Sequence, residues 1–170
     1  DNVDDKTEDE SKDENIIETD KATDFIFPTY NDVKVNDWHF KYVEDLTEKG
    51  IISGDGTGNF NPDSKVTREQ FLKMLILASC AETEEAENTF EDVNYNDWYA
   101  SYVLKAKKLG IVNGISDTEF GIGNNITRQD MAVMIARVLE TNGIKVEDSN
   151  VVGFSDAKDV SDYAKNSVKF

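Results

Sequence analysis

A segment of this 170-residue chain returns sixty positions later, and this repeat limits the fold more than any other feature. Tyr30-Asn-Asp-Val-Lys-Val-Asn-Asp-Trp38 is matched by Phe90-Glu-Asp-Val-Asn-Tyr-Asn-Asp-Trp98. The same offset, without a gap, aligns three further landmarks: Gly50–Gly54 with Gly110–Gly114, Phe60 with Phe120, and Thr67-Arg68 with Thr127-Arg128. Self-similarity at a fixed period indicates a repeat architecture, in which each unit buries its apolar face against its neighbours.

Each Thr-Arg pair is predicted to start a helix. The threonine is a favourable N-cap. A polar residue three positions later, Gln70 or Asp130, can return a hydrogen bond to it in a capping box. Arg68 and Arg128 fall at the first helical position, where a cation opposes the helix dipole at a cost of roughly a few tenths of a kcal/mol or more. An arginine at this place in both copies suggests a role other than helix stability. Apolar residues then recur at helical spacing (Phe71, Met74, Leu75 and Ala78; Met131, Met134, Ile135 and Val138).

An earlier helix and a loop are predicted in each unit. Asp37 and Asp97 are the expected N-caps of these helices. Gly50 and Gly110 are expected to end them in the left-handed conformation. The turn-forming residues 54–59 then predict a tight, irregular loop that an aromatic residue holds to the core. The helices themselves carry one apolar stripe each (Trp38, Tyr42, Val43 and Leu46; Trp98, Tyr102, Val103 and Ala106).

The C-terminal part of the sequence reads as the opening of a third unit, with Tyr163 at the tryptophan position and one extra residue before it. We therefore divide the chain into a head (1–24), a first repeat (25–85), a second repeat (86–149) and the start of a third (150–170). A third glycine loop and a third Thr-Arg pair are not in this sequence. We expect grooves that need them to be incomplete.

The net charge of -17 at pH 7 is unevenly spread, because residues 1–24 hold eleven acidic residues against three lysines. This head lacks aromatic residues and periodicity, so we expect a solvated, disordered linker, with a loose calcium-attracting tract as the alternative. Such an acidic chain does not suit nucleic acid or an anionic membrane surface as a partner. No apolar run is long enough to cross a bilayer, so membrane insertion is not expected.

The motifs of each repeat closely resemble those of the S-layer homology (SLH) family. They follow one another in the same order, from the Phe/Tyr-x-Asp-Val turn to the Val/Ile-Thr-Arg turn. The resemblance covers two full repeats, residues 30–139, and a fragment from residue 154 onward. It implies an all-α fold of helix-loop-helix repeats, packed as a pseudo-threefold, three-pronged spindle around a central helix bundle and incomplete here. Members of this family anchor surface proteins non-covalently to the secondary polysaccharide of a Gram-positive-type cell wall, often one that carries ketal-linked pyruvate.

The resemblance also implies which residues contact the glycan. In the family, the arginine of the Thr-Arg turn faces a groove between neighbouring repeats and contacts the anionic sugar, which nominates Arg68 and Arg128. The first-turn aromatic residue and its preceding aspartate line such grooves, and loop glycines allow close approach of the backbone. These roles nominate Trp38, Trp98, Asp37, Asp97, Gly54 and Gly114. The family's usual Thr-Arg-Ala-Glu differs in both copies. The second loop also lacks the Asp-Gly turn and has Ile122 in place of Pro62, so its groove is expected to be altered or silent.

Each candidate also has a plainer role. A guanidinium can hold a carboxylate through two parallel hydrogen bonds, but Arg68 and Arg128 can instead pair with acidic neighbours. Trp38 and Trp98 can stack on a sugar face, yet each begins an apolar stripe, so we expect core positions with some exposure at a groove edge. The two aspartates are expected to be helix caps first and ligand contacts second.

Neither a metal site nor a cofactor is expected. The loop Asp55-x-Thr57-x-Asn59-x-Asn61 offers oxygen atoms at alternate positions, but the glycine and glutamate that an EF-hand requires are replaced by Phe60 and Val66. A weak ion site of another kind stays open.

Catalysis is not expected either. The sole histidine, His39, is predicted on the polar side of a helix and has Tyr99 at the matching position of the second repeat. The sole cysteine, Cys80, ends an apolar run and is predicted to be a small buried residue. No nucleophile–base arrangement or phosphate-binding loop is present in the sequence.

The sequence therefore predicts a non-enzymatic anchoring module outside the cell, in the wall or S-layer of a Gram-positive-type bacterium. Its predicted partner is an anionic secondary cell-wall polysaccharide, bound in the groove between repeats one and two, with pyruvylation as one candidate modification. The alternative is a structural module that associates with other S-layer subunits and does not bind glycan. Concentration-dependent oligomers in the absence of wall polymer would favour that alternative.

Overall fold

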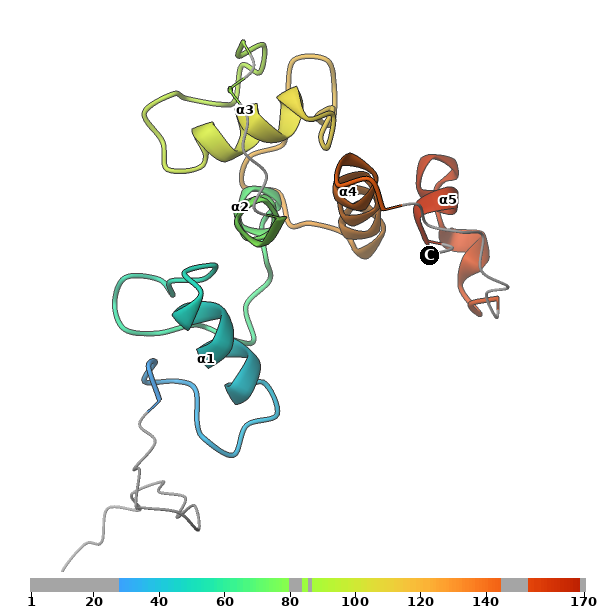
Figure 1. Cartoon of the computed structure of the whole chain (residues 1–170). Coiled ribbons are helices and arrows are strands. Elements are labelled where there is room, and N and C mark those ends of the chain that lie inside the picture. Colours follow the sequence, from blue (N-terminus) through green and yellow to red (C-terminus); the bar gives the residue numbers. More distant parts are fainter. Residues whose placement is uncertain (1–27, 80–83, 86, 145–152, 169–170) are drawn as a thin grey trace, which may run out of the picture. The chain divides into compact units, whose positions relative to one another are not determined.

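The computed structural model describes residues 28–79, 84–85, 87–144 and 153–168. The predicted acidic head and Cys80 lie outside these residues. The chain divides into two compact units, Asp1–Pro62 and Asp63–Phe170. The described residues form helices and loops without a β-strand, apart from an isolated bridge between Thr67 and Asn125 (Figure 1). The predicted all-α class is confirmed.

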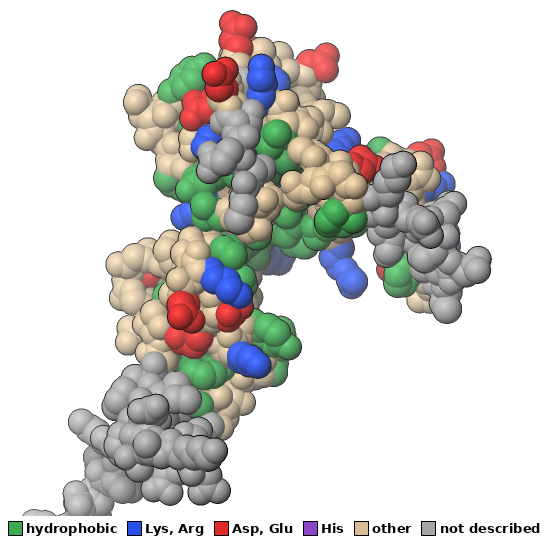
Figure 2. All heavy atoms as spheres, viewed as in Figure 1, with side chains coloured by type: hydrophobic (Ala, Val, Ile, Leu, Met, Phe, Trp, Pro, Cys, Tyr) green, Lys and Arg blue, Asp and Glu red, His purple; other side chains and the backbone are tan. Residues whose placement is uncertain are grey.

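The first unit is built around helix α1 (Phe40–Glu48) and the loops on either side of it. The Phe60 ring lies 5.6 Å from the ring of Tyr30, between centroids, and so holds the glycine-rich loop to the first turn. Acidic and basic side chains are interspersed over α1 on the face shown in Figure 2. Lys49 pairs with Asp45 at 2.7 Å. The buried hydrophobic residues of this unit are Tyr30, Val33, Val43 and Ile52.

The second unit contains three longer helices, α2 (Arg68–Ser79), α3 (Ala100–Lys108) and α4 (Arg128–Thr141). Two short 3-10 turns, η1 (Ala157–Asp159) and η2 (Asp162–Ala164), lead into α5 (Lys165–Val168). Helix α2 packs against α3 and α4, and α4 packs against α5. The second helix of one repeat therefore packs against the first helix of the next.

The core of the second unit lies where these helices meet the loop after α3. Its largest fully buried side chains include Phe120, Leu72 and Ile111. In α2 the buried hydrophobic residues are Leu72 and Ile76, whereas Ala78 is exposed. The buried face of α2 therefore lies to one side of the predicted apolar stripe, because α2 packs against both α3 and α4. Among the described helices, none has both the length and the apolar character that a bilayer span requires.

The aspartate of each Phe/Tyr-x-Asp-Val turn ties that turn to the loop of the same repeat. Asp32 accepts hydrogen bonds from the backbone N–H groups of Phe60 and Asn61 at 2.8 and 2.7 Å. Asp92 accepts three, from Phe120, Gly121 and Ile122, at 2.7–2.9 Å. Burial raises the pKa of Asp92, but these three bonds outweigh it and leave the pKa below its ordinary value.

The predicted threonine caps of the second helices are confirmed. Thr67 N–H donates to Gln70 Oε1 at 3.0 Å, and Gln70 N–H donates to Thr67 Oγ1 at 3.4 Å. Thr127 Oγ1 accepts from Asp130 N–H at 3.2 Å and donates to the Asp130 carboxylate at 2.7 Å. These contacts satisfy donors that a helix start otherwise leaves unpaired.

The prediction that Asp37 and Asp97 cap the first helices was wrong. Helices α1 and α3 begin two positions later than expected, with His39 and Tyr99 at the N-cap and no side-chain cap bond. A turn precedes each helix, and the aspartates belong to it. Asp37 Oδ2 accepts from Lys34 N–H at 2.7 Å, and Asp97 Oδ2 accepts from the Tyr99 hydroxyl at 2.7 Å.

The expectation that the two tryptophans are core residues was also wrong. Trp38 is 84% exposed and Trp98 is 53% exposed. Both lie in the turn before the helix, so their side chains do not continue the buried face of the helix that follows. Each ring instead packs edge-on against the next aromatic residue, His39 or Tyr99, at 5.4 Å between centroids.

The glycines predicted to end the first helices do so. Gly50 and Gly110 have φ values of 69° and 73°. In the first repeat, Gly50 N–H donates to Thr47 O and Ile51 N–H donates to Leu46 O, both at 2.9 Å. The second repeat has the same pair of bonds, so both helices end in a Schellman motif.

Candidate ligand-binding groove

The start of α2 lies against the segment that leads into α4. Arg68 N–H donates to Asn124 O at 2.9 Å, and the buried Glu69 carboxylate accepts from Gly123 N–H at 3.1 Å. These bonds join positions more than fifty residues apart in the sequence. The Thr-Arg turn of the first repeat is therefore anchored on the loop of the second.

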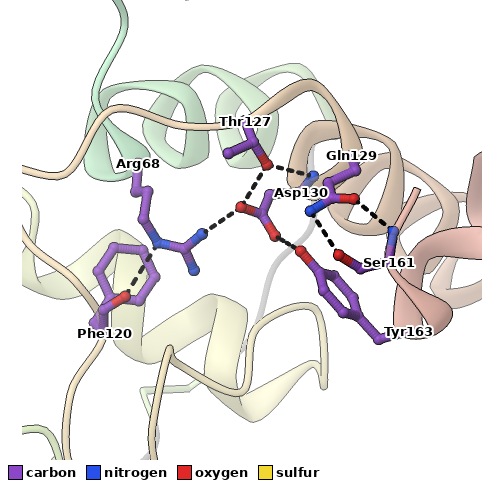
Figure 3. Close-up of polar contacts among 7 residues, drawn as sticks. All are labelled: Arg68, Phe120, Thr127, Gln129, Asp130, Ser161 and Tyr163. Carbon is purple, nitrogen blue, oxygen red and sulfur yellow. Dashed lines mark hydrogen bonds and ion pairs between the residues drawn. The ribbon is translucent and has the colours of Figure 1, made fainter. Parts of the chain in front are cut away.

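The Arg68 side chain is only 8% exposed, and it is held by groups of the second repeat. Its Nε donates to Phe120 O at 3.1 Å, and its guanidinium carbon lies 5.2 Å from the centroid of the Phe120 ring. Its Nη1 lies 3.3 Å from Asp130 Oδ2 (Figure 3). Arg68 therefore has the acidic partner that the plainer interpretation predicts, and its contact with a glycan stays a prediction.

Asp130 also joins α4 to the third-repeat segment. The Tyr163 hydroxyl donates to Asp130 Oδ1 at 2.8 Å (Figure 3). Beside it, Gln129 accepts from Ser161 N–H at 3.0 Å and donates to Ser161 Oγ at 3.2 Å. Burial, then the hydrogen bond to Asp130, raises the pKa of Tyr163, which favours the protonated hydroxyl that donates this bond.

A groove of about 430 Å³ lies beside this network, within the second unit. One wall is a single stripe of α4, Asp130, Val133, Met134 and Arg137, whose i, i+3, i+4, i+7 spacing places them on one helix face. The volume falls in the range of sites for small molecules. The rest of the lining comes from the loop after α3 and from two side chains outside α4 (residues 111–115, Arg68 and Tyr163).

Arg137 is a groove residue that the sequence analysis did not identify. Its Nη1 donates to Ile111 O at 3.0 Å, and the side chain is partly buried. Among the described residues it has no carboxylate partner. The available signal was its position on one helix face with Val133 and Met134, because a charged residue follows two apolar ones there.

The other predicted arginine, Arg128, does not line this groove. It is exposed at the first position of α4, and it makes no hydrogen bond or ion pair with the part of the chain that the structure describes. Arg68 and Arg128 occupy equivalent sequence positions but differ in their surroundings.

The loop glycines are required by packing. Gly114 lines the groove and has φ 89°, and a Cβ there would lie 2.4 Å from Glu119 O and 2.7 Å from the Phe90 ring. Gly54, in the first unit, has φ 62°, and a Cβ there would lie 2.5 Å from the Tyr30 ring. Both glycines therefore have a structural reason that is independent of any ligand.

The remaining predicted site residues lie outside the groove lining. Trp98 and Asp97 belong to the turn before α3, and the ammonium group of Lys73 lies 5.6 Å from the Trp98 ring centroid. Trp38 and Asp37 lie in the equivalent turn of the first unit. The exposure of both tryptophans leaves their ring faces accessible to a ligand.

No metal centre is found in the described residues, which hold no group of three or more histidine, cysteine, aspartate or glutamate side chains suited to an ion. The carboxylate of Asp55 is used within its own loop. It accepts from Thr57 N–H at 2.8 Å and from the Asn61 side chain at 2.7 Å. These bonds lower the pKa of Asp55 to about 2.

Paired helices that recur along the chain and pack against those of the next unit define a helical repeat protein. The sequence profile of the S-layer homology domain matches this chain twice, at residues 29–72 and 89–132. The chain therefore belongs to the S-layer homology domain family, which confirms the resemblance found in its repeats.

Similar proteins carry different names. An endoglucanase of Bacillus sp. (strain KSM-635) is 31% identical over 153 residues, which cover 89% of this chain and 16% of the endoglucanase. Exoglucanase XynX of Acetivibrio thermocellus is 33% identical over 141 residues, 82% of this chain and 13% of that protein. The surface-layer 125 kDa protein of Lysinibacillus sphaericus is 30% identical over 133 residues, 78% of this chain and 11% of that protein. The chain thus spans less than a fifth of each of these relatives.

Proposed function

We propose that this chain is a cell-wall anchoring module that binds an anionic secondary cell-wall polysaccharide in the groove of its second unit. The second-repeat loop forms part of this groove, and its departures from the family pattern predicted an altered or silent site; the proposal differs from that prediction because two arginines line the groove. The proposal rests on the family, on relatives that include a surface-layer protein and a middle cell wall protein, and on the charge of the groove.

The charge of the groove is the observation that carries the proposal. Its charged lining residues are Arg68, Asp130 and Arg137, so the groove holds one net positive charge in a chain of net charge -17. A polyanion is repelled by the chain at long range, but salt screens that repulsion beyond about 8–10 Å. The groove then offers a local cationic contact.

The contact chemistry follows from the residue types. A guanidinium binds the carboxylate of a pyruvate ketal through two parallel hydrogen bonds, and the groove offers two guanidinium groups, those of Arg68 and Arg137. Arg128 lies outside the groove lining and is proposed to contact the polymer beyond the groove. Exposed aromatic rings cover the C–H face of a sugar, which suits Trp38 and Trp98. Asp37 and Asp97 are proposed to accept bonds from sugar hydroxyls, and the two loop glycines, Gly54 and Gly114, to allow close approach.

The proposal places the module outside the cell, on the wall of a Gram-positive-type bacterium, with a binding and not a catalytic role. It includes the finer architecture that the family implies, a three-pronged spindle around a central helix bundle. The glucanase names of the relatives are not transferred, because the alignments cover only 13–16% of those enzymes.

Co-sedimentation tests this function. The purified chain is mixed with wall sacculi that carry the secondary polysaccharide and with the same sacculi after the polymer has been stripped. We expect saturable binding to the first and loss of binding to the second. Equal binding to both, or none, would contradict the proposal, and concentration-dependent oligomers without polymer would favour association with S-layer subunits instead.

A further inference from the structure

The two arginines that line the groove differ in how much of each guanidinium is free. Arg68 already holds the Asp130 carboxylate and the Phe120 carbonyl, and only 8% of its side chain is exposed. Arg137 makes one hydrogen bond, to a neutral carbonyl, and has no ion pair within the described ranges. An anion in the groove would therefore have to compete with Asp130 for Arg68 but not for Arg137.

The open donors of Arg137 are accessible. Only Nη1 is engaged, and neither Nε nor Nη2 is a buried donor without a partner, so both are in contact with solvent. A guanidinium carries five N–H donors in a fixed fork. The free edge of Arg137 can therefore hold a carboxylate through two parallel hydrogen bonds.

The guanidinium is also fixed in direction. Its acceptor, Ile111, is 1% exposed, and Ile111 N–H donates to Ala106 O at 2.8 Å in the helix-ending motif of α3. A cation tied to such a rigid carbonyl loses less freedom when it binds a ligand. Arg137 lies seven residues beyond Asp130 on α4, about 10 Å along the helix axis, so one end of the groove holds the Arg68–Asp130 ion pair and the other holds Arg137, which has no ion pair among the described residues.

The first repeat has no arginine at this position. The equivalent residue of the first repeat, sixty positions earlier, is Leu77, in the second helix of that repeat. A residue that served only to tie α4 to the preceding loop would be expected in both repeats. The difference between Arg137 and Leu77 points to a role particular to this groove.

We propose that Arg137 is the residue that binds the carboxylate group of the ligand in this groove, with Arg68 acting as a positioning residue for Asp130 and Tyr163. This assignment rests on the proposed function. In it, the Arg137 guanidinium is the group that selects an acidic sugar.

A defined probe tests the assignment. The full chain is titrated with a methyl hexopyranoside that carries a 4,6-linked pyruvate ketal, as the free acid and as its methyl ester, and binding is followed by NMR. The variants are Arg137→Leu, which introduces the residue of the first repeat, and Arg137→Lys, which keeps the charge. Lys108→Gln, on the exposed end of α3, is the control for loss of one positive charge.

We expect the wild-type chain and Lys108→Gln to bind the acid at least about tenfold more tightly than the ester. Arg137→Leu should lose that preference, and Arg137→Lys should keep part of it because an ammonium cannot form the paired bonds. Circular dichroism establishes whether each variant is folded. If Arg137→Leu does not fold, the test rests on Arg137→Lys, which should prefer the acid over the ester less strongly than the wild-type chain does.

Two results would overturn the assignment: no acid preference in the wild-type chain, or an unchanged preference in the Arg137 variants. The sacculus experiment separates these from failure of the proposed function. If the wild-type chain binds polymer-bearing sacculi and the Arg137 variants bind equally well, the anchoring function stands and the assignment of Arg137 is wrong. If the wild-type chain does not bind sacculi, the function itself fails.

Discussion

The Arg68 guanidinium and the Asp130 carboxylate lie 3.3 Å apart, although these residues belong to the first turns of helices in successive repeats. The pair is partly buried, with side chains 8% and 23% exposed. Asp130 also accepts the Tyr163 hydroxyl, so one carboxylate connects elements of all three repeat segments (Figure 3). Residues that form a groove wall are thereby fixed by contacts between repeats.

Replacing Asp130 by asparagine should destabilise the second unit. The change leaves Arg68 buried without its anion and weakens the bond to Tyr163, which together should lower the free energy of unfolding by about 1–3 kcal/mol. Urea unfolding followed by circular dichroism measures this. Asp117→Asn, on an exposed loop, is the matched control and should change the midpoint little. Equal midpoints for the two variants would show that the ion pair does not stabilise the fold.

Arg68→Lys and Arg128→Lys should both weaken retention on wall sacculi without a change in helical content. Arg68→Lys should also lower stability, by about 1–2 kcal/mol, because it removes the bond to Phe120 O. Arg128 makes no such contact among the described residues, so its variant should stay within about 0.5 kcal/mol of wild type. Retention and urea unfolding are measured for both. If neither variant loses retention, neither arginine contributes to binding of the wall polymer.

Gly114→Ala should destabilise the chain more than Gly123→Ala. Both glycines have positive φ, 89° and 78°, so both substitutions carry the cost of a left-handed residue, about 1–2 kcal/mol. Only at Gly114 would the new Cβ also overlap the Glu119 carbonyl, at 2.4 Å, and the Phe90 ring. The unfolding midpoints of the two variants measure the difference, and equal losses would mean that the loop relaxes freely.

Stability should fall with decreasing pH below about 4. The pKa of Asp92 is lowered in the folded chain, so its contribution is present above the unfolded pKa of about 3.9 and is lost as the pH falls through the folded value. Asp32 and Asp55 have lowered pKa values and act in the same direction. Urea midpoints between pH 2 and 6 should show a smaller fall for Asp92→Asn than for wild type. If the urea midpoint falls equally in Asp92→Asn and in wild type, groups other than Asp92 cause the acid sensitivity.

Local features of the fold were predictable because each depends on a few adjacent residues. Thr67 and Thr127 cap helices, and Gly50 and Gly110 end them, as their spacing predicts. The tryptophans were misplaced because an aromatic residue shortly before a helix resembles the start of its apolar stripe. The backbone in fact turns once more before the helix begins.

The groove could not be derived from the sequence in the same way. The partners of Arg68 lie 52 and 62 positions away, at Phe120 and Asp130, and no local pattern specifies such contacts. Arg137 was missed because its position is apolar in the first repeat, where Leu77 stands, so the comparison of repeats gave it no weight. Contacts between repeats, and departures from the repeat, need the three-dimensional arrangement.

Methionine methyl NMR on the full chain tests groove binding most directly, because one of its three methionines lines the groove. Solubilised wall polysaccharide is titrated into methyl-labelled protein, and the signals of Met134 and of Met74, which is not part of the groove lining, are compared. Binding in the groove predicts a saturable shift of the Met134 signal and little change at Met74. Saturable binding that leaves Met134 unchanged, or shifts Met74 alone, would contradict binding in this groove.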